Sequence, residues 1–407
     1  MQLPDWFSKI RAPLEARLKA LDPFPFDQPE ECEGFIACHH NDYLRLSRHP
    51  EVTAARNAAT EKTGSGAMAS VVYGGFSGFH GEFQKLIAES TQAPGPESVV
   101  LTTCGWTANV GLMEAIVNPD LPVYLDIHAH ASLWDGARFS GARIIPLRHN
   151  DTASLRRFVA SFGPGVVAID GFYSTNGSVA PVEEYAVTCE ETGCLLVVDE
   201  AHSFAMTGDK GGGLAVERGV AHRVPIRTVS IAKGLGGHGG FIVTDQETAR
   251  YLTYRLRSVI FSSAPTPSTS AGNCKALEIV MREPERAQQA QARARQLRDL
   301  LNKAGVDTGP SGCQIVSLMF KGVEAVCRLY AELKKRGILF SAFLPPAVPE
   351  NTSLARFSIY HGLSEQDVEL LFGHGVEANN FNDDALGKTL DKIYAAGPGK
   401  VFSAVVL

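Results

Sequence analysis

The sequence predicts an α/β protein in which a large domain with a mainly parallel, seven-stranded sheet is followed by a smaller α+β domain. Between residues 98 and 244, short apolar runs alternate with helical patterns, as in a parallel sheet with helices on both faces. Polar residues follow several of these runs, at the edge where such sheets bind ligands. The chain has 407 residues, enough for two cores, and its character changes after Phe261, at Pro265 and Pro267.

Apolar periodicity and chain breakers give the expected elements. Four segments are expected: an N-terminal arm (1–45), a large domain (46–262), a small domain (263–378) and a tail of unknown role (379–407). The strands expected in the large sheet are 98–103, 122–126, 143–147, 165–170, 195–199, 227–231 and 240–244. Other expected strands are 35–38, 313–320, 338–343 and 355–360, and expected helices are 5–20, 50–63, 105–117, 268–303, 322–336 and 364–373.

Composition and charge exclude several classes of protein. The net charge is -6 without a long basic run, so neither nucleic acid nor an anionic membrane is an expected partner. No apolar run approaches the roughly 18 residues that span a bilayer, and the first residues lack signal-peptide features, so we expect a cytoplasmic protein. The eight cysteines have no framework spacing. Cys32, Cys38, His39 and His40 lack the paired ligands of a zinc site, so no metal is expected.

The stretch around Asp199 and Lys233 carries the strongest chemical signal. Leu195 to Val198 form an apolar run that leads directly into Asp199, which predicts a buried strand ending in a carboxylate. An unpaired buried ion costs several kcal/mol, so this carboxylate needs a cation. A protonated pyridine ring would supply one, and Lys233, after another short strand, could hold that ring as a Schiff base. This pair is typical of a pyridoxal-phosphate enzyme.

Each of these residues also has a simpler interpretation when it is taken alone. Asp199 could cap a following helix, and Lys233 could be solvated. The glycines from Gly234 to Gly240 could suggest a dinucleotide site, but they do not form the G-x-G-x-x-G fingerprint after a first strand. The combination with other strand-end residues favours the cofactor.

Candidates at other strand ends fit the same cofactor. The turn Cys104–Trp106 opens a helix, whose free N–H groups suit a phosphate. His130 follows the second strand and could stack on the ring or be structural, and Ser174 lies shortly after Asp170. Arg356 on the last strand suits a carboxylate, although a surface arginine is the simpler alternative.

Together these residues resemble the α-oxoamine synthases, fold-type I pyridoxal-phosphate enzymes that condense an amino acid with an acyl-coenzyme A. The matching stretches are Asn41–Leu44, Gly64–Ala67, His80, Asp126–Ser132, His149–Asn150, Asp199–Ser203, Ser230 with Lys233, and Arg356. Within the family, the sequence most resembles the synthases of α-hydroxyketone autoinducers of the cholera type. That likeness lies in Gly105–Leu112, Ala129–Arg138, Tyr173–Thr175, Phe261–Ser263 and the single arginine of Arg356–Ser358.

The resemblance implies a role for each candidate. Lys233 would hold the cofactor and move protons at the substrate α-carbon, and Asp199 would pair with the pyridinium nitrogen. Arg356 would bind the donor carboxylate, and Asn41 would border the substrate. The other implied contacts are ring stacking by His130, bonds to the ring 3-oxygen from His202 and Ser174, phosphate binding by Cys104, Gly105, Trp106 and Ser230, and phosphate contacts from a second subunit by Ser262 and Ser263. A homodimer with shared active sites is therefore expected.

Three functional hypotheses follow. The first is an autoinducer-type synthase, which joins S-adenosylmethionine or a small amino acid to a medium- or long-chain acyl-coenzyme A. The second is a primary-metabolism synthase of the 8-amino-7-oxononanoate, 2-amino-3-ketobutyrate or serine palmitoyltransferase kind. The third is a non-catalytic pyridoxal-binding regulatory module.

The acyl chain would need an apolar wall, because each buried methylene contributes about 0.8 kcal/mol. The glycine-rich segment 64–81 is expected to lack regular structure. The candidates for the wall are Met68, Val71, Val72, Tyr73, Phe76 and Phe79 of this segment, with Phe340 and Phe343. These side chains could equally pack a dimer interface.

Overall fold

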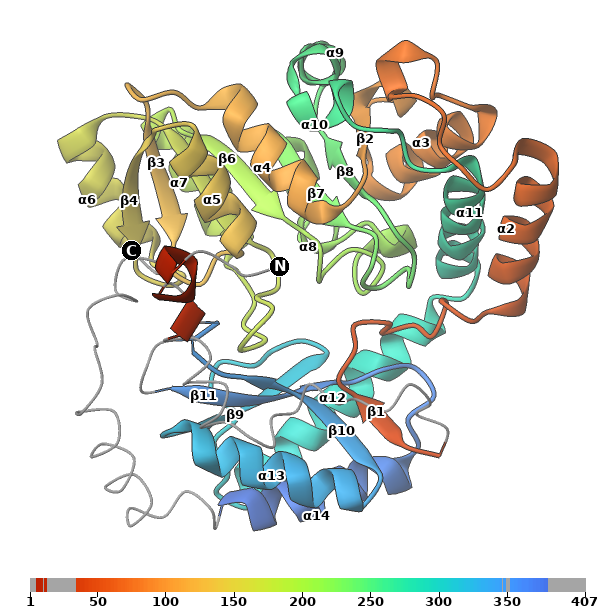
Figure 1. Ribbon diagram of the computed structural model, residues 1–407. Coiled ribbons are helices and arrows are strands. Elements are labelled where there is room, and N and C mark those ends of the chain that lie inside the picture. Colours follow the sequence, from red (N-terminus) through yellow and green to blue (C-terminus); the bar gives the residue numbers. More distant parts are fainter. Residues whose placement is uncertain (1–4, 10, 13–33, 346, 349–351, 380–407) are drawn as a thin grey trace.

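The computed structural model describes residues 5–9, 11–12, 34–345, 347–348 and 352–379, and it forms two lobes (Figure 1). The helix expected over 5–20 lies largely outside the described residues, as does the expected tail beyond Asn379. Among the residues described, no helix is long and apolar enough to cross a bilayer.

The larger lobe is built on a seven-stranded sheet in the order β2-β8-β7-β6-β5-β3-β4. Its strands are β2 (Val99–Thr102), β3 (Pro122–Asp126), β4 (Arg143–Leu147), β5 (Val166–Asp170), β6 (Leu195–Asp199), β7 (Ile226–Ser230) and β8 (Gly240–Val243). Only β8 runs antiparallel to its neighbours β2 and β7. The mainly parallel sheet and its seven strands are therefore confirmed, with ends shifted by at most one residue.

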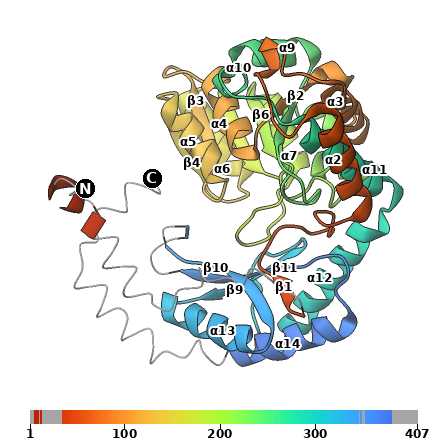
Figure 2. The ribbon, with the colours of Figure 1, turned by 45° about the vertical axis from the view of Figure 1, so that its right-hand side comes forward.

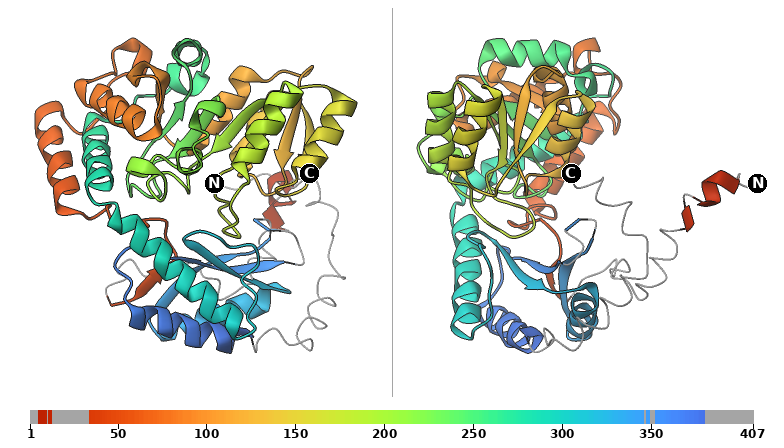
Figure 3. Two further views of the ribbon diagram at one scale, coloured as in Figure 1. Left: turned by 180° about the vertical axis from the view of Figure 1, so that it is seen from behind. Right: turned by 90° about the vertical axis from the view of Figure 1, so that its left-hand side faces the viewer.

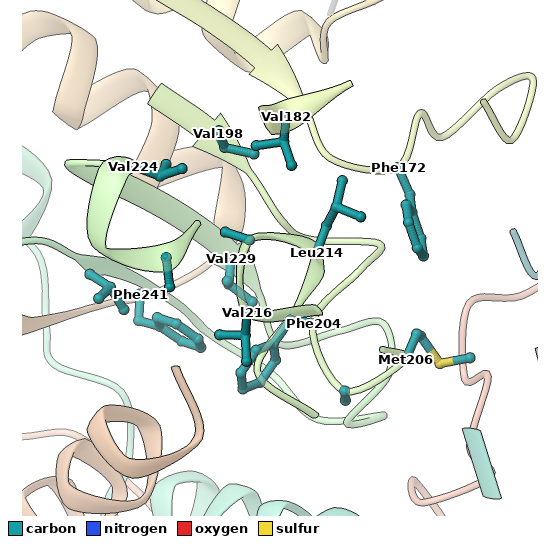
Figure 4. Close-up of a cluster of buried hydrophobic side chains, with 14 of the residues drawn as sticks. Phe172, Val182, Val198, Phe204, Met206, Leu214, Val216, Val224, Val229 and Phe241 are labelled. Carbon is teal, nitrogen blue, oxygen red and sulfur yellow. The ribbon is translucent and has the colours of Figure 1, made fainter. Parts of the chain in front are cut away.

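Helices cover both faces of this sheet because alternate strand residues are buried on opposite sides. Val167 and Val198 belong to a core with side chains of α3, α7 and α11, part of which Figure 4 shows around Phe204, Leu214 and Phe241. Val166 belongs to the opposite core with side chains of α4, α5 and α9. These helices are α3 (Gly78–Thr91), α4 (Gly105–Ile116), α5 (Ala131–Phe139), α7 (Val182–Thr192), α9 (Gln246–Arg255) and α11 (Pro267–Arg282).

The register of the parallel strands brings their carboxyl ends level. Asp170 at the end of β5 pairs with Asp199 at the end of β6, and Asp199 pairs with Thr228 of β7. The residues that follow these strands therefore meet at one edge of the sheet, which faces the smaller lobe (Figure 1).

The smaller lobe contains a four-stranded sheet in the order β1-β10-β11-β9. Its strands are β1 (Ile36–Cys38), β9 (Ile315–Phe320), β10 (Ile338–Phe343) and β11 (Ser353–Ser358). The first of these comes from the N-terminal part of the chain and pairs with β10 in parallel. In Figure 1 the sheet lies between the larger lobe and helices α13 (Val323–Lys335) and α14 (Glu365–Asn379).

Helix α11 packs against α2 (Pro50–Thr63) and α3 of the larger lobe (Figure 2), and α12 (Glu285–Lys303) continues along the smaller sheet (Figure 3). The other helices are α6 (Thr152–Phe162), α8 (Leu214–Glu217) and α10 (Arg257–Ile260), with 3-10 turns η1 (Val71–Tyr73), η2 (Pro96–Ser98), η3 (Asp209–Gly211) and η4 (Ala221–Arg223).

Three expectations about the elements are wrong. The single helix over 268–303 is two helices, because Pro284 has no N–H to continue α11. Within 64–81, η1 and the start of α3 are regular, and Ser77 caps α3 together with the His80 side chain. The strand expected at 355–360 lies two residues earlier, at Ser353–Ser358.

Candidate active site

Asp199 is a buried carboxylate without a cationic side chain beside it. Its side chain accepts hydrogen bonds from Asn109 Nδ2 at 2.6 Å and from the Ala201 N–H at 2.9 Å. Both donors are neutral, and the described part of the chain contains no ion pair to Asp199. Since a buried ion without a counter-charge is costly, this geometry leaves room for a cation that the protein itself does not supply.

Lys233 follows β7 in a tight turn at the same sheet edge. Burial and then the Arg356 charge lower the pKa of its amine, Asp199 opposes both effects, and the resulting pKa is about 8. Among the described residues, its Nζ atom has neither a hydrogen-bond partner nor an ion pair. The turn is packed closely against Asp42 and requires glycine at position 236. The φ of Gly236 is +59°, and a Cβ on this residue would lie 2.5 Å from Asp42 Oδ1. Lys233 therefore presents an amine whose neutral form is a larger fraction near physiological pH than in an ordinary lysine.

His130 precedes α5, where its backbone N–H donates to Asp170 Oδ1 at 3.0 Å. Its ring nitrogen Nδ1 lies 2.7 Å from Ser132 Oγ, and that hydroxyl accepts from Asn109 Nδ2 at 2.8 Å. Asn109 thus connects the His130 ring to Asp199. Burial lowers the pKa of His130, while the Asp199 charge raises it, so the structure holds a ring in fixed orientation close to the carboxylate.

The first turn of α4 packs against the end of β7. A Cβ on Gly105 would lie 2.5 Å from Ser230 Cβ, so only glycine allows this approach. Cys104 is the N-cap residue, and its N–H already donates to Thr107 Oγ1 at 3.1 Å. Gly105 and Trp106 occupy the first helical positions, whose N–H groups have no acceptor within a helix. These N–H groups and Ser230 form a site suited to a phosphate.

His202 and Arg356 are joined through Tyr43 and Asn41. Tyr43 Oη lies 2.7 Å from His202 Nδ1, and it also donates to Asn41 Oδ1 at 3.1 Å. Arg356 Nη2 donates to the same Asn41 oxygen at 2.9 Å. Burial, followed by the charges of Lys233 and Arg356, lowers the pKa of His202 well below its ordinary value.

Arg356 is a buried cation without a carboxylate partner. It is 4% exposed, and its Nη1 donates to the Ser174 carbonyl oxygen at 2.9 Å. Its Nε atom is buried and has no partner among the described residues, in which no ion pair joins Arg356 to an acid. The Phe343 ring lies 4.9 Å from the guanidinium carbon. A ligand carboxylate would satisfy this charge.

The described chain does not bring every expected residue into this site. Ser262 and Ser263 follow α10, which is fixed to α4 by a bond from Ser258 Oγ to the Thr107 carbonyl. Ser262 Oγ donates to the Ser263 carbonyl at 3.5 Å, and among the described residues neither serine hydrogen-bonds to any other expected site residue. Their contact from a second subunit stays a prediction. Phe340 as part of an acyl wall is wrong, because its ring is fully buried against Tyr330 and Phe357 in the smaller core.

Sequence reasoning missed four side chains that position the site. They are Asn109 between Asp199 and His130, Ser132 behind the His130 ring, Tyr43 behind His202, and Asp170 under the His130 backbone. Burial, followed by the Asp199 charge, raises the pKa of Asp170 well above its ordinary value. A signal was present for Asn109, which stands one turn after Gly105 on the helix that opens the expected phosphate site.

The residues present fit pyridoxal phosphate. Asp199 has no counter-cation in ion-pair contact among the residues that the structure describes, and a protonated pyridine nitrogen would supply one. Lys233 offers an unpartnered amine, and the close approach of Gly105 to Ser230 leaves helix N–H groups for a phosphate. The orphaned Arg356 Nε atom matches the carboxylate of an amino acid.

Comparison with known proteins agrees with this fit. The model of the family described as aminotransferase class I and II matches residues 35–374, and that of a domain of unknown function (DUF4277) matches residues 350–407. The chain belongs to the aminotransferase class I and II family.

Among the relatives is the CAI-1 autoinducer synthase of Vibrio campbellii, 32% identical over 86% of this chain and 88% of that protein. The 8-amino-7-oxononanoate synthase of Pseudomonas aeruginosa is 34% identical over 83% and 84%. The serine palmitoyltransferase of Caulobacter vibrioides is 31% identical over 81% and 82%. A solved serine palmitoyltransferase from S. paucimobilis with bound PLP and myriocin superposes with a TM-score of 0.85 at 25% identity, covering 93% of this chain and 99% of that one.

These likenesses place the chain among the α-oxoamine synthases, with the fold of the type I pyridoxal-phosphate transferases. Its cofactor is pyridoxal phosphate.

Proposed function

We propose that this enzyme joins an amino-acid donor, S-adenosylmethionine or a small amino acid, to a medium- or long-chain acyl-coenzyme A, and that the product is an aminoketone-type precursor of a quorum-sensing signal. The observation that carries the acyl-transfer proposal is the proximity of Lys233 and Asp199, at the carboxyl edge of the larger sheet, to Arg356 of β11 in the smaller lobe, which has no acidic partner among the described residues. An amine, an anion and a carboxylate-binding cation are the groups required to activate an amino acid at its α-carbon.

Bound pyridoxal phosphate supplies an electron sink for the carbanion at the donor α-carbon. In our proposal Asp199, fixed by Asn109, pairs with the ring nitrogen and keeps it protonated. His130 stacks on the ring, and His202 with Ser174 binds the ring 3-oxygen. The N–H groups of Gly105 and Trp106 hold the phosphate, with Cys104 as the helix cap and Ser230 beside it.

Arg356 binds the donor carboxylate, and Asn41 borders the donor. Lys233 takes the proton from the donor α-carbon, which its lowered pKa allows near neutral pH. A carbon–carbon bond then forms between the α-carbon and the thioester carbonyl carbon. The carbon–sulfur bond breaks, coenzyme A leaves as the thiol, and the donor carboxylate is lost as carbon dioxide.

Two observations support the autoinducer branch. The relative from Vibrio campbellii is named for that activity. Strand β11 offers one arginine to the site, since Phe357 lies in the smaller core and Ser358 is the next residue. The apolar side chains of 64–81 are partly open, with Met68 89% and Tyr73 71% exposed, and we propose that they border the acyl chain together with Phe343.

Release of free thiol from a series of acyl-coenzymes A tests the proposal. Acetyl-, hexanoyl- and decanoyl-coenzyme A are compared with S-adenosylmethionine, glycine, L-alanine and L-serine as donors, and products are identified by mass spectrometry. We expect kcat/KM to rise from acetyl to decanoyl by more than about tenfold, which burial of two methylenes would give. A preference for acetyl- or succinyl-coenzyme A would replace the autoinducer branch with primary metabolism.

The primary-metabolism alternative has its own support, because the Pseudomonas aeruginosa 8-amino-7-oxononanoate synthase is as similar as the autoinducer synthase. Pimeloyl-coenzyme A with L-alanine therefore belongs in the same assay. The regulatory-module alternative would be accepted if pyridoxal phosphate binds but no combination releases thiol.

We further propose a homodimer with shared active sites. Met68, Tyr73, Phe76 and Phe261 are exposed apolar side chains, and a bond from the Ala264 N–H to the Ala69 carbonyl at 2.9 Å places their two segments together. A second subunit would cover them and bring Ser262 and Ser263 to its phosphate site. Light scattering should show a dimer. Lys233→Ala subunits mixed with subunits that lack the Ser262 and Ser263 hydroxyls should regain activity, because a mixed dimer contains one site with Lys233 from one subunit and both serines from the other. An active monomer would contradict the proposal.

A further inference from the structure

A second buried polar cluster lies at the carboxyl ends of β3 and β4, next to the segment that leads to His130. Asp126 ends β3 and is fully buried. It accepts hydrogen bonds from the backbone N–H groups of His128 and Asn150, both at 2.8 Å, and from His149 Nδ1 at 3.0 Å. These bonds fix the start of the 126–130 segment.

His149 reaches from this cluster to a second segment. Its Nε2 atom lies 2.8 Å from Ser178 Oγ. The Ser178 hydroxyl also donates to Asn176 Oδ1 at 2.8 Å, so Ser178 links His149 to the neighbouring turn. The Tyr173 ring contacts the His149 ring edge-on, with centroids 4.4 Å apart. His149 therefore joins Asp126 to residues 171–180, which we call the bridging loop.

The bridging loop is a closed turn with one side on each lobe. The Tyr173 N–H donates to the Ser178 carbonyl at 2.9 Å, which closes the turn. On the side of the smaller lobe, Arg356 donates to the Ser174 carbonyl at 2.9 Å, and the Gly312 N–H donates to the Gly177 carbonyl at 2.8 Å. His149 and Arg356 thus both hydrogen-bond to the bridging loop.

The serine, histidine and aspartate of this cluster have the order of a hydrolase triad, but the environment argues against that chemistry. Ser178 is 2% exposed, and its proton is already donated to Asn176. A nucleophile must reach a substrate. The cluster is therefore an internal support.

We propose that His149 is a positioning residue for acyl transfer, which sets the bridging loop against the 126–130 segment and thereby fixes Arg356 relative to His130. This inference rests on the proposed function, because it assigns Arg356 to the donor carboxylate and His130 to the cofactor ring. His149 touches neither ligand in this arrangement. Its effect passes through the Ser178 bond toward Arg356 and through the Asp126 bond toward His130.

The first test uses Ser178→Ala, which removes the hydrogen bond between His149 and the bridging loop. In the protein without cofactor, hydrogen exchange should become faster by more than about threefold in the peptide that contains Gly312, since one buried hydrogen bond contributes about 1 kcal/mol. Val326→Ala, which shortens a buried side chain of the smaller core, is the control for a general loss of stability. Faster exchange confined to residues 171–180 would show that the loss of the His149–Ser178 bond does not reach the smaller lobe, and it would overturn the proposal. This measurement does not depend on turnover.

The second test separates the two halves in the holoenzyme. His149→Asn keeps a donor near the Nδ1 position for Asp126 but cannot reach Ser178, whereas His149→Ala loses both bonds. For S-adenosylmethionine and L-alanine, with decanoyl-coenzyme A, both variants and Ser178→Ala should raise the donor KM by about three- to tenfold. Only His149→Ala should also change the circular dichroism of the cofactor band.

The outcomes distinguish this inference from the proposed function. If the wild type releases no thiol, the proposed function fails, while the hydrogen-exchange and dichroism measurements still decide the role of His149. If the wild type turns over and the three variants keep its donor KM and its dichroism, His149 is merely structural and the inference is wrong.

Discussion

Two neighbouring acids at the end of β6 have opposite surroundings. Asp199 is bound by the neutral donors Asn109 and Ala201 N–H, and no cation of the described residues forms an ion pair with it. Glu200 turns to the other side, where it accepts from the Ala215 N–H at 2.8 Å and lies 4.0 Å from Arg227. Both acids are buried, with exposed fractions of 6% and 1%.

The difference shows how a structural charge is told apart from a functional one. Glu200 has its counter-charge within the fold, and Arg227 in turn donates to the Thr91 carbonyl at 2.8 Å. Burial still raises the pKa of Glu200, so the pair is a costly internal support. Asp199 has no such partner, and its charge is available to a bound cation. Arg356 is the equivalent case among the cations.

The largest expected effect is that of Lys233→Ala. Among the described residues the Lys233 amine has no hydrogen bond or ion pair to lose, so the variant should fold, but the visible absorbance of bound pyridoxal phosphate should disappear. Thiol release should fall by about a thousandfold or more, as expected for loss of an acid–base group. Absorbance spectra and a thiol assay measure both quantities, and a variant that keeps the wild-type band would contradict the assignment.

The comparison itself is tested by Asp199→Asn and Glu200→Gln. Asp199→Asn should reduce cofactor affinity by about a hundredfold, which loss of a buried ion pair would give, with little change in unfolding. Glu200→Gln should lower the free energy of unfolding by about 3 kcal/mol, because Arg227 is left without its counter-charge. Its turnover per folded molecule should be unchanged. Cofactor titration and urea unfolding distinguish the two, and equal effects in both variants would break the comparison.

Arg356→Lys sharpens the comparison on the side of the cations. Lysine keeps the charge but cannot offer the planar fork that binds a carboxylate with two hydrogen bonds. Donor binding should weaken about ten- to hundredfold, because charge-assisted bonds contribute about 1.5–3 kcal/mol. Spectral titration with each donor measures this. Unchanged donor dependence would make Arg356 a structural cation like Arg227.

A smaller effect concerns pH. The neutral amine captures pyridoxal phosphate, and the lowered pKa of Lys233 means that this form increases as pH rises through about 8 rather than 10.5. The rate of cofactor capture by the protein without cofactor should therefore rise with pH around that midpoint. Arg356→Gln removes a charge that lowers this pKa, so the midpoint should move upward. If the pH midpoint of cofactor capture is the same in Arg356→Gln as in the wild type, the charge of Arg356 does not lower the pKa of Lys233.

Much of this site could be predicted from the sequence, because strand ends mark it. The apolar run before Asp199 and the short strand before Lys233 predicted two residues at one sheet edge, and the register of β5, β6 and β7 places them there. Arg356 was expected on the last strand, as β11 shows, but the sequence did not decide between a buried and a surface position for it.

The partners of Asn109 and Tyr43 could not be predicted, because each of these bonds joins elements far apart in the chain. Asn109 and Asp199 are 90 positions apart, and Tyr43 and His202 are 159 apart. No local pattern encodes such pairs. The break at Pro284 was readable, but the Ala- and Arg-rich composition of the stretch that follows it favoured one long helix.

Borohydride reduction of the holoenzyme, followed by peptide mass mapping, tests the central claim most directly, because it fixes the cofactor permanently to the residue that holds it. We expect a single pyridoxyl-modified peptide, the one containing Lys233, and unmodified protein after the same treatment of Lys233→Ala. A modification at another lysine, or none in wild-type protein saturated with pyridoxal phosphate, would contradict the account.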